Sequence, residues 1–451
     1  WATRVLSSRG HRPWRSLTKA RLLRFARNDI RFWWGVFGLA VLWGIIVGLA
    51  RRNDFGNLFL DANGYFYALM VFPFWWVVKW ETNSESNPNS TNYEFGIRNI
   101  RAHSPFVSLG AVFLAATTLL ALKTLFAVYI FTHAGNNFLD ANLEPFYRWV
   151  RDTGVGEITW LPGNFARVFF QSQVYNVVVW FVLLTNVILR SRTTKDPARM
   201  GETRIRAGFF ASLRMTALWL LILNTSVIIV SFSRSFWVGI IAGLVVLVVL
   251  MGRKWQIRSI RHIRLIGQIG GVVGGATIAT VLLLFAVMRF PFPQPSLADL
   301  SEATQSRLEA GEAGTSRWNL LPPLVRAGLE HPILGSGFGR TVTYISNDPR
   351  IREVNPRGQY TTYAFEWGWV DVWVKTGLIG LIGLIGLIGY IGIILFRQVK
   401  TEPLALAGLA ALGGLAAIHF FTPYLNHPLG LGILILATLY VIPSQNPQTR
   451  G

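Results

Sequence analysis

Apolar residues occur in long blocks along this chain, and short polar segments separate the blocks. Stretches such as LFAVYIFT, VVVWFVLL, LVVLVVLM and TVLLLFAVM lie inside blocks long enough to cross a bilayer, which takes about 20 residues. The alternating segments of about ten residues that mark a membrane β-barrel do not occur. The pattern predicts an all-α polytopic membrane protein with about ten transmembrane helices. The predicted spans are residues 32–50, 63–80, 104–132, 170–190, 207–232, 236–251, 265–289, 369–396, 404–421 and 428–442.

Basic residues gather in the polar segments between these spans. The 451-residue chain has 43 Lys and Arg against 22 Asp and Glu, with no cysteine. Basic segments at 1–31, 190–206, 253–264 and 397–400 fall on one side of an alternating path. Because Lys and Arg accumulate on the cytoplasmic side, we expect both termini in the cytoplasm and the chain in the cytoplasmic membrane. A distribution that follows membrane orientation argues against nucleic acid as a partner.

The same path divides the chain into four parts. These are a basic cytoplasmic segment (1–31), the first seven spans (32–289), a long extracytoplasmic loop (290–368), and three spans with a C-terminal tail (369–451). The loop is too long for a simple turn, and long loops are often functional.

Short helices are predicted within this loop. Ser296 can cap a helix that reaches about Glu309. A second helix is expected at 317–330, where apolar residues recur at helical spacing. Pro322 and Pro323 are expected to start or kink this helix.

The segment HPILGSGFGR (331–340) looks like a nucleotide-phosphate cradle, because glycine-rich loops hold phosphates in many enzymes. However, no Lys-Ser/Thr follows, and the topology places the segment outside, where ATP is not normally available. We instead expect Gly335, Gly337 and Gly339 to end the preceding helix and turn the chain, and His331 to cap or orient the helix end.

Arginine residues are frequent in and beside the long loop. They include Arg289, Arg317 and Arg326, and Arg234 lies in a turn between two spans. Guanidinium groups bind phosphates through paired hydrogen bonds and stay charged at any working pH. Such a cluster next to lipid suggests an anionic, membrane-anchored substrate such as a lipid diphosphate. Contact with headgroups and snorkelling is the alternative explanation for each arginine alone.

Three segments in order are similar to motifs of one membrane-protein family. SFSRSFWVG (231–239) is similar to a Ser-Arg-Gly-x-Trp-x-Gly signature, TSRWNLLPPLVRAGLEHPILGSGFG (315–339) to a long periplasmic loop, and VWVKTGLIGLIGLI (372–385) to a stretch that re-enters the membrane. The family that they resemble is the O-antigen ligase and O-antigen polymerase superfamily. The resemblance covers about 200–396, and the N-terminal half is similar only in hydropathy.

The resemblance implies a metal-independent, inverting glycosyltransferase that needs no cofactor. Such enzymes move a glycan from a polyprenyl diphosphate to an acceptor hydroxyl on the outer face of the membrane, so membrane lipids are further partners. By position, the family's diphosphate-binding arginines correspond to Arg234 and Arg317, and Arg289 and Arg326 are further candidates in the same cluster. Fixed arginines stabilise the charge that grows on a diphosphate leaving group. No cluster of residues has the spacing of metal ligands.

One position departs from the family pattern. Many members carry a His-Asn pair about eleven residues before the re-entry motif, and here that position holds Glu366. The family histidine is thought to help activate the acceptor hydroxyl, and a carboxylate can accept the same proton. Glu366 is therefore the candidate base and Asp371 the second candidate. The alternative is that Glu366 merely pairs with a loop arginine.

Two other classes of protein remain open. Transporters and lipid flippases often have internal repeats and broken helices near the midplane. No clear repeat relates the two halves, although Lys123, Arg214 and Lys375 lie within predicted spans. A scaffold without activity is the third interpretation, because of the departure at Glu366. The sugar, the acceptor, the choice between polymerase and ligase, and the oligomeric state do not follow from the sequence.

Overall fold

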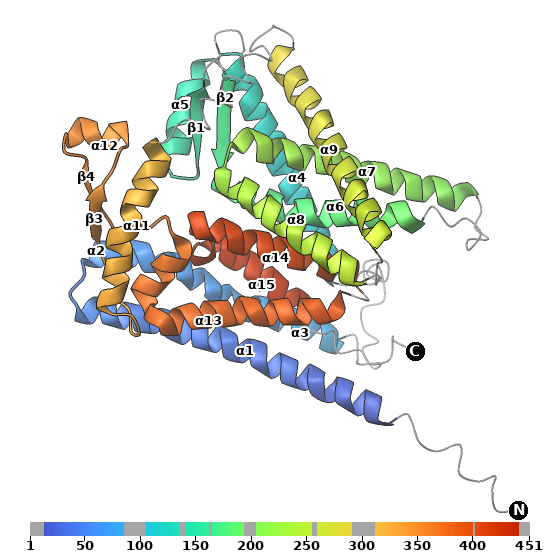
Figure 1. Cartoon of the computed structure of the whole chain (residues 1–451), viewed down its shortest axis with the longest axis horizontal. Coiled ribbons are helices and arrows are strands. Elements are labelled where there is room, and N and C mark those ends of the chain that lie inside the picture. The colour runs from blue at the N-terminus through green and yellow to red at the C-terminus, as the bar shows by residue number, and fades with distance from the viewer. Residues whose placement is uncertain are drawn as a thin grey trace, which may run out of the picture.

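Long helices that lie side by side dominate the computed structural model (Figure 1). The structure describes residues 13–84, 105–134, 140–161, 165–193, 204–254, 259–290, 312–399 and 402–441. The helices in these ranges are α1 (Pro13–Ala50), α2 (Phe55–Ala62), α3 (Val71–Ser84), α4 (Pro105–Thr132), α5 (Asp140–Asp152), α6 (Val174–Thr193), α7 (Arg204–Ser231), α8 (Arg234–Lys254), α9 (Ser259–Arg289), α11 (Glu312–Glu330), α12 (Pro349–Val354), α13 (Gly368–Gln398), α14 (Pro403–Phe421) and α15 (Pro428–Val441). Three 3-10 helices accompany them, η1 (Asn63–Met70), η3 (Gln171–Gln173) and η5 (Tyr424–Asn426).

Seven helices of the described chain are long and apolar enough to cross a membrane. They are Ile30–Ala50, Leu109–Thr132, Gln171–Leu189, Arg234–Gly252, Leu265–Arg289, Gly368–Gln398 and Pro403–Phe421. Two shorter apolar helices are Met215–Ser231 and Pro428–Val441. The prediction of an all-α polytopic membrane protein is confirmed. The predicted span at 63–80 is instead divided between η1 and α3, and the count of about ten spans stays a prediction.

In the segment between α9 and α13, the second predicted helix begins earlier than expected. Helix α11 begins at Glu312, so Pro322 and Pro323 lie inside it and do not start it. The helix predicted up to Glu309 lies outside the described residues.

Two short antiparallel hairpins were not predicted by the hydrophobic pattern. One pairs β1 (Gly156–Leu161) with β2 (Phe165–Phe170), and the other pairs β3 (Val342–Ile345) with β4 (Gln359–Thr362).

Close packing of α13 on α1 depends on small residues. A Cβ atom at Gly386 would lie 1.9 Å from the ring of Trp33, and one at Gly383 would lie 3.4 Å from the backbone of Phe37. Small side chains let membrane helices approach closely and gain dispersion contacts. The low-complexity glycine run of α13 therefore packs against α1 over part of its length.

A separate apolar cluster joins α11 to the start of α13. Leu320 and Leu324 of α11 pack with Val342 of β3 and with Phe365, Trp367 and Val374, and all six side chains are buried. The helix before the glycine-rich segment, the hairpin and the entry to α13 therefore form one packed unit.

Candidate functional site

Helix α13 is broken at Gly377, where φ is 69° and ψ is −172°. Glycine adopts positive φ without a Cβ clash. A break of this kind leaves backbone donors and acceptors without helical partners, and another segment must supply them. Residues 331–340, which we call the glycine loop, do so. The bonds run from Ser336 N–H to the Val374 carbonyl (2.6 Å), from Gly337 N–H to the Lys375 carbonyl (3.0 Å), and from Leu378 N–H to the Pro332 carbonyl (2.9 Å).

The glycines of this loop allow the close approach. Gly335, Gly337 and Gly339 have φ values of 75°, 81° and 76°. A Cβ at Gly335 would lie 2.5 Å from the backbone nitrogen of Gly377, and one at Gly337 would lie 2.2 Å from that of Gly48 in α1. The three glycines therefore turn the chain after α11 and seat it between α1 and α13.

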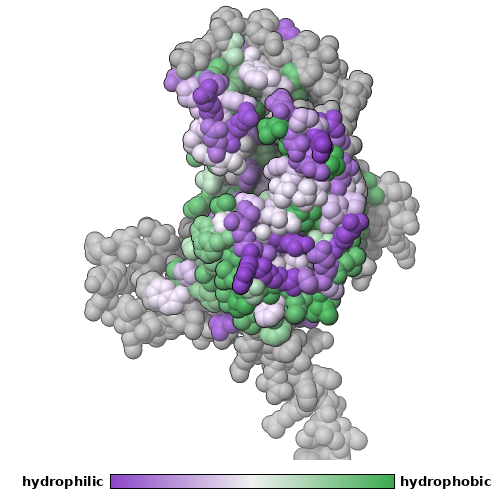
Figure 2. All heavy atoms as spheres, turned by 90° about the vertical axis from the view of Figure 1, so that its left-hand side faces the viewer, coloured by the Kyte–Doolittle hydropathy of each residue, from purple (hydrophilic) through white to green (hydrophobic). Residues whose placement is uncertain are grey.

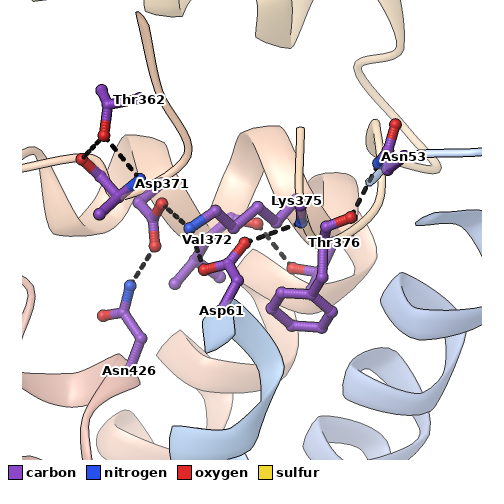
Figure 3. A network of polar contacts seen from close by, with 11 residues as sticks. Asn53, Asp61, Thr362, Asp371, Val372, Lys375, Thr376 and Asn426 are labelled. Carbon is purple, nitrogen blue, oxygen red and sulfur yellow. Dashed lines mark hydrogen bonds and ion pairs between the residues drawn. The ribbon is translucent and has the colours of Figure 1, made fainter. Parts of the chain in front are cut away.

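A network of charged side chains is buried beside the break (Figure 3). Lys375 is 2% exposed, and its ammonium pairs with Asp61 of α2, which is 8% exposed, and with Asp371, which is 3% exposed. The amide of Asn426 donates to Asp371, and Gly339 N–H donates to Asp61 over 3.0 Å. Burying an ion costs several kcal/mol unless partners compensate it. The network therefore ties α2, the glycine loop, η5 and the first turns of α13 together.

Asp371, the second candidate base, belongs to this network. Its carboxylate faces Lys375 and Asn426 (Figure 3), and the residue is almost fully buried. This placement favours a role in holding the start of α13 in position.

Arg317 and Glu366 meet at the edge of the packed unit. The Arg317 guanidinium pairs with the Glu366 carboxylate, and the two side chains are 39% and 49% exposed. The Trp367 indole N–H donates to the Arg317 carbonyl over 2.9 Å, while its ring is buried in the cluster below. An ion pair that is open to water contributes about 1 kcal/mol or less. Arg317 and Glu366 can therefore separate at little cost in free energy, and each can then bind a ligand instead.

Arg234 begins α8 and is exposed. The next residue, Ser235, accepts a hydrogen bond from the Thr422 hydroxyl at 3.1 Å, just beyond α14. Phe421 at the end of α14 packs against Trp367, with ring centroids 5.7 Å apart. A chain of contacts thus leads from the start of α8 to the residue after Glu366. The starts of α8 and α13 both lie toward the left-hand side of Figure 1, where α11 also lies.

Two further arginines are not brought to the Arg317–Glu366 pair. Arg289 ends α9, which finishes at the top of Figure 1, away from α11, and its guanidinium lies over the Phe285 ring at 5.4 Å. Arg326 is exposed on α11, nine positions after Arg317. Nine helical positions correspond to about 13 Å and about two and a half turns, so Arg326 lies on the opposite face of the helix.

His331 lies where α11 passes into the glycine loop and is partly exposed. Its carbonyl accepts a hydrogen bond from Gly335 N–H over 2.9 Å. Burial lowers the pKa of its imidazole, and the positive charge of Arg51 lowers it further.

Sequence reasoning missed the partnership of Asp61 and Lys375. An ionisable residue within a membrane span is costly, so Lys375 in a predicted span was a signal that a buried partner exists. The position of that partner did not follow, because Asp61 lies 314 residues earlier.

Fold and site together define a polytopic α-helical membrane protein with a charged cluster at a broken helix. Residues 217–385 match the family model described as O-antigen ligase. The chain thus carries an O-antigen ligase domain over these residues, and its resemblance to the O-antigen ligase and O-antigen polymerase superfamily is confirmed. The matched stretch contains Arg234, Arg317, Glu366 and the glycine loop. No match to the curated proteins was found.

Proposed function

We propose that the protein transfers or polymerises glycan from a polyprenyl-diphosphate-linked donor to an acceptor hydroxyl on the outer face of the cytoplasmic membrane. The observation that carries this proposal is the exposed Arg317–Glu366 pair, which lies within the O-antigen ligase domain. The domain supports glycan transfer in general. The donor lipid, the acceptor, the membrane side and the absence of a metal from the reaction belong to the proposal.

In the proposed reaction, an arriving diphosphate displaces Glu366 from Arg317. The guanidinium gains charge-assisted, bidentate hydrogen bonds to phosphate oxygens, which are stronger than its exposed pair with one carboxylate. Arg234, whose neighbour connects through α14 to Trp367, is the second diphosphate ligand. The displaced carboxylate of Glu366 becomes free to accept a proton.

The chemical step then makes one bond to the sugar and breaks another. The acceptor oxygen attacks the anomeric carbon from the side opposite the diphosphate, while Glu366 takes the hydroxyl proton. The bond between the anomeric carbon and the diphosphate oxygen breaks, and its electron pair stays on the diphosphate. Fixed guanidinium groups stabilise the added negative charge.

The buried network has a positioning role in this proposal. Lys375 and Asp371 hold the first turns of α13, and Glu366 lies two residues before that helix begins. A catalytic group must stay close to its productive position, because a displacement of about 1 Å can lower a rate by about 100-fold.

A transporter or flippase is not favoured by the family match. Transporters also use broken helices and buried charges. In this chain the break at Gly377 and Lys375 lie inside the O-antigen ligase domain.

The proposal is tested in cells by replacing Arg317 with Ala or Lys and measuring the amount and length of surface glycan. Both variants should lose most product, because Lys keeps the charge but lacks the bidentate geometry. Arg326→Ala is the matched control on the opposite face of α11 and should leave the product unchanged. Unchanged product in Arg317→Ala would contradict the proposal.

A further inference from the structure

The turn that leads into Arg234 has a strained backbone. Helix α7 ends at Ser231 and α8 begins at Arg234, so only two residues join the helices. One of them, Phe232, has a φ of 46°. A positive φ is rare for a bulky residue, and it persists only where the surrounding structure enforces it. Other parts of the protein must therefore hold this turn in place.

The β1–β2 hairpin supplies contacts that hold the turn. Arg167 of β2 is 5% exposed, and its Nε–H donates to the Ser231 carbonyl over 2.7 Å. This carbonyl belongs to the last residue of α7, where acceptors lack helical donors and a positive charge is favoured. The Nη1–H of the same guanidinium donates to the Glu157 carboxylate over 2.7 Å. The buried Phe232 ring meets the Phe165 ring of β2 edge-on, with 5.3 Å between centroids.

The surroundings of Arg167 fit a structural contact rather than a ligand site. Its side chain is almost inaccessible to solvent, and it donates to two acceptors of the protein itself. A buried charge is costly unless hydrogen-bonded partners compensate it, and here Ser231 and Glu157 do so. An arriving phosphate would have to displace both partners from a closed position. Arg167 can therefore influence a ligand only through the turn that it contacts.

The turn determines the direction in which Arg234 leaves α8. The N–H groups of Phe236 and Trp237 donate to the Ser233 carbonyl over 3.1 and 3.3 Å, which closes the first turn of the helix. The hydroxyls of Ser233 and Ser235 lie 3.0 Å apart, and the exposed Arg234 lies between these two serines in the chain. A side chain leaves a helix in a direction fixed by the backbone. A rotation of the turn would therefore redirect the Arg234 guanidinium.

The hairpin and Arg234 meet near a hydrophilic face of the molecule. Strand β2 lies beside the start of α8 in Figure 1, in agreement with the hydrogen bond from Arg167 to Ser231. Figure 2 looks onto the left-hand side of Figure 1, toward which the starts of α8 and α13 lie, and hydrophilic residues gather on this face. A charged diphosphate can approach such a face without crossing an apolar surface.

We propose that Arg167 is a positioning residue for diphosphate binding. It holds the turn at 231–233, the turn fixes the direction of Arg234, and Arg234 binds the diphosphate. This inference rests on the proposed function, in which Arg234 is the second diphosphate ligand. It gives a role in that site to a hairpin that lies before residues 217–385, the part of the chain that matches the O-antigen ligase family.

The test follows two properties of the full-length protein in lipid nanodiscs. Amide hydrogen exchange of residues 231–237 reports on the turn, and calorimetric binding of polyprenyl diphosphate reports on the site. Arg167→Ala should speed exchange in this segment by about 10-fold or more, because the Ser231 carbonyl loses a charged donor. It should also weaken diphosphate binding by about 10-fold, because Arg234 is no longer held in its binding direction. Arg167→Lys keeps the buried charge on a single nitrogen, so it should fold and show both changes at about 3-fold.

A double-mutant cycle separates positioning from a general structural effect. Arg234→Ala should weaken diphosphate binding by about 10-fold or more. Adding Arg167→Ala to this variant should then change the affinity by less than about 2-fold, because Arg167 acts only through Arg234. Arg148→Ala is the matched control and should alter neither exchange nor binding. It removes an ion pair with Glu144 on α5, beside β1, whose side chains are 70% and 65% exposed.

The outcomes distinguish this inference from the proposed function. Wild-type exchange at residues 231–237 in both Arg167 variants overturns the inference, and so does an additive cycle. Weaker binding by Arg234→Ala, with wild-type binding by both Arg167 variants, overturns the positioning role and leaves the proposed function standing. Wild-type binding by Arg234→Ala contradicts the proposed role of Arg234 itself, and the inference then fails with it.

Discussion

Replacing Lys375 with Met would remove the ammonium that the structure places between Asp61 and Asp371. The substitution keeps a long, unbranched side chain of similar volume, so the packing of α13 changes little. It leaves two carboxylates that are 8% and 3% exposed without the cation that pairs with both. The remaining donors are the Asn426 amide and the Gly339 N–H.

The expected loss follows from this count of partners. Breaking a buried ion pair by removing one partner costs about 3–5 kcal/mol, because the other charge stays buried. Here one ammonium pairs with two carboxylates, so we expect the loss of unfolding free energy in Lys375→Met to lie at the upper end of that range. Asp61→Asn keeps the Lys375–Asp371 pair and replaces one charged acceptor with an amide, so it should cost less, about 1–3 kcal/mol.

The assay is reversible unfolding of the purified protein in mixed micelles, followed by tryptophan fluorescence. The set comprises wild type, Lys375→Met, Asp61→Asn, and the triple variant Lys375→Met with Asp61→Asn and Asp371→Asn. The triple variant buries no ion in this network, and it should therefore recover most of the stability that Lys375→Met loses.

Two results would refute this reasoning. One is a Lys375→Met protein whose free energy of unfolding lies within about 0.5 kcal/mol of the wild-type value, which is the range of ordinary surface substitutions. The other is a triple variant less stable than Lys375→Met, since that would mean that the carboxylates do not require a compensating charge.

Three further predictions concern the glycine loop, the chemistry and the pH dependence. Gly337→Ala should lower the unfolding free energy by more than about 2 kcal/mol, because the positive φ alone costs about 1–2 kcal/mol and the new Cβ would lie 2.2 Å from the Gly48 nitrogen. Gly389→Ala, where nothing lies within 4 Å, is the matched control and should not melt earlier in the same thermal scan. Because the proposed reaction uses no metal, adding EDTA to the purified protein should leave the rate of glycan transfer unchanged. A loss of transfer that is reversed by added Mg²⁺ would contradict this. His331 has a lowered pKa, so the unfolded chain binds more protons just below the ordinary histidine pKa of about 6.5, and stability should fall as the pH drops through that value. His331→Gln should make stability less steeply dependent on pH between about 6.5 and 5, and an unchanged slope would count against a lowered pKa of this imidazole in the folded protein.

The helical framework could be predicted from the sequence because each membrane span depends only on the local run of apolar residues. An apolar block of sufficient length must form a helix in lipid, where no water satisfies the backbone. The hairpins could not be predicted from the sequence in the same way. β3 and β4 have four residues each, and their pairing depends on packing against α11 rather than on a strong alternating pattern.

The candidate site could be predicted only in part from the sequence. The motifs led to Arg317 and Glu366, but their contact depends on the packing of Trp367 beneath them. The pairing of Asp61 with Lys375 joins segments 314 residues apart, and no local pattern encodes it. By contrast, the spacing of Arg326 from Arg317 alone places the two residues on opposite faces of one helix.

The break at Gly377 shows why a single motif was ambiguous. The glycine loop looked like a phosphate cradle, because its glycines free several backbone amides. In the structure, the amides of Ser336 and Gly337 donate to carbonyls of α13. Whether such amides serve a ligand or a broken helix depends on the partner segment, which lies outside the motif.

The central claim is that Arg317 and Glu366 act as a unit in glycan transfer. Its most direct test is a double-mutant cycle with purified Arg317→Ala, Glu366→Gln and the double variant, measuring release of polyprenyl diphosphate from a lipid-linked donor extracted from the host. Residues that act as a unit are strongly non-additive. We predict that each single variant loses about 100-fold or more in rate, and that the double variant is little slower than the slower single variant. Single variants that both retain activity within about 3-fold of wild type would contradict the account, because the free energy of activation would then change by less than about 1 kcal/mol.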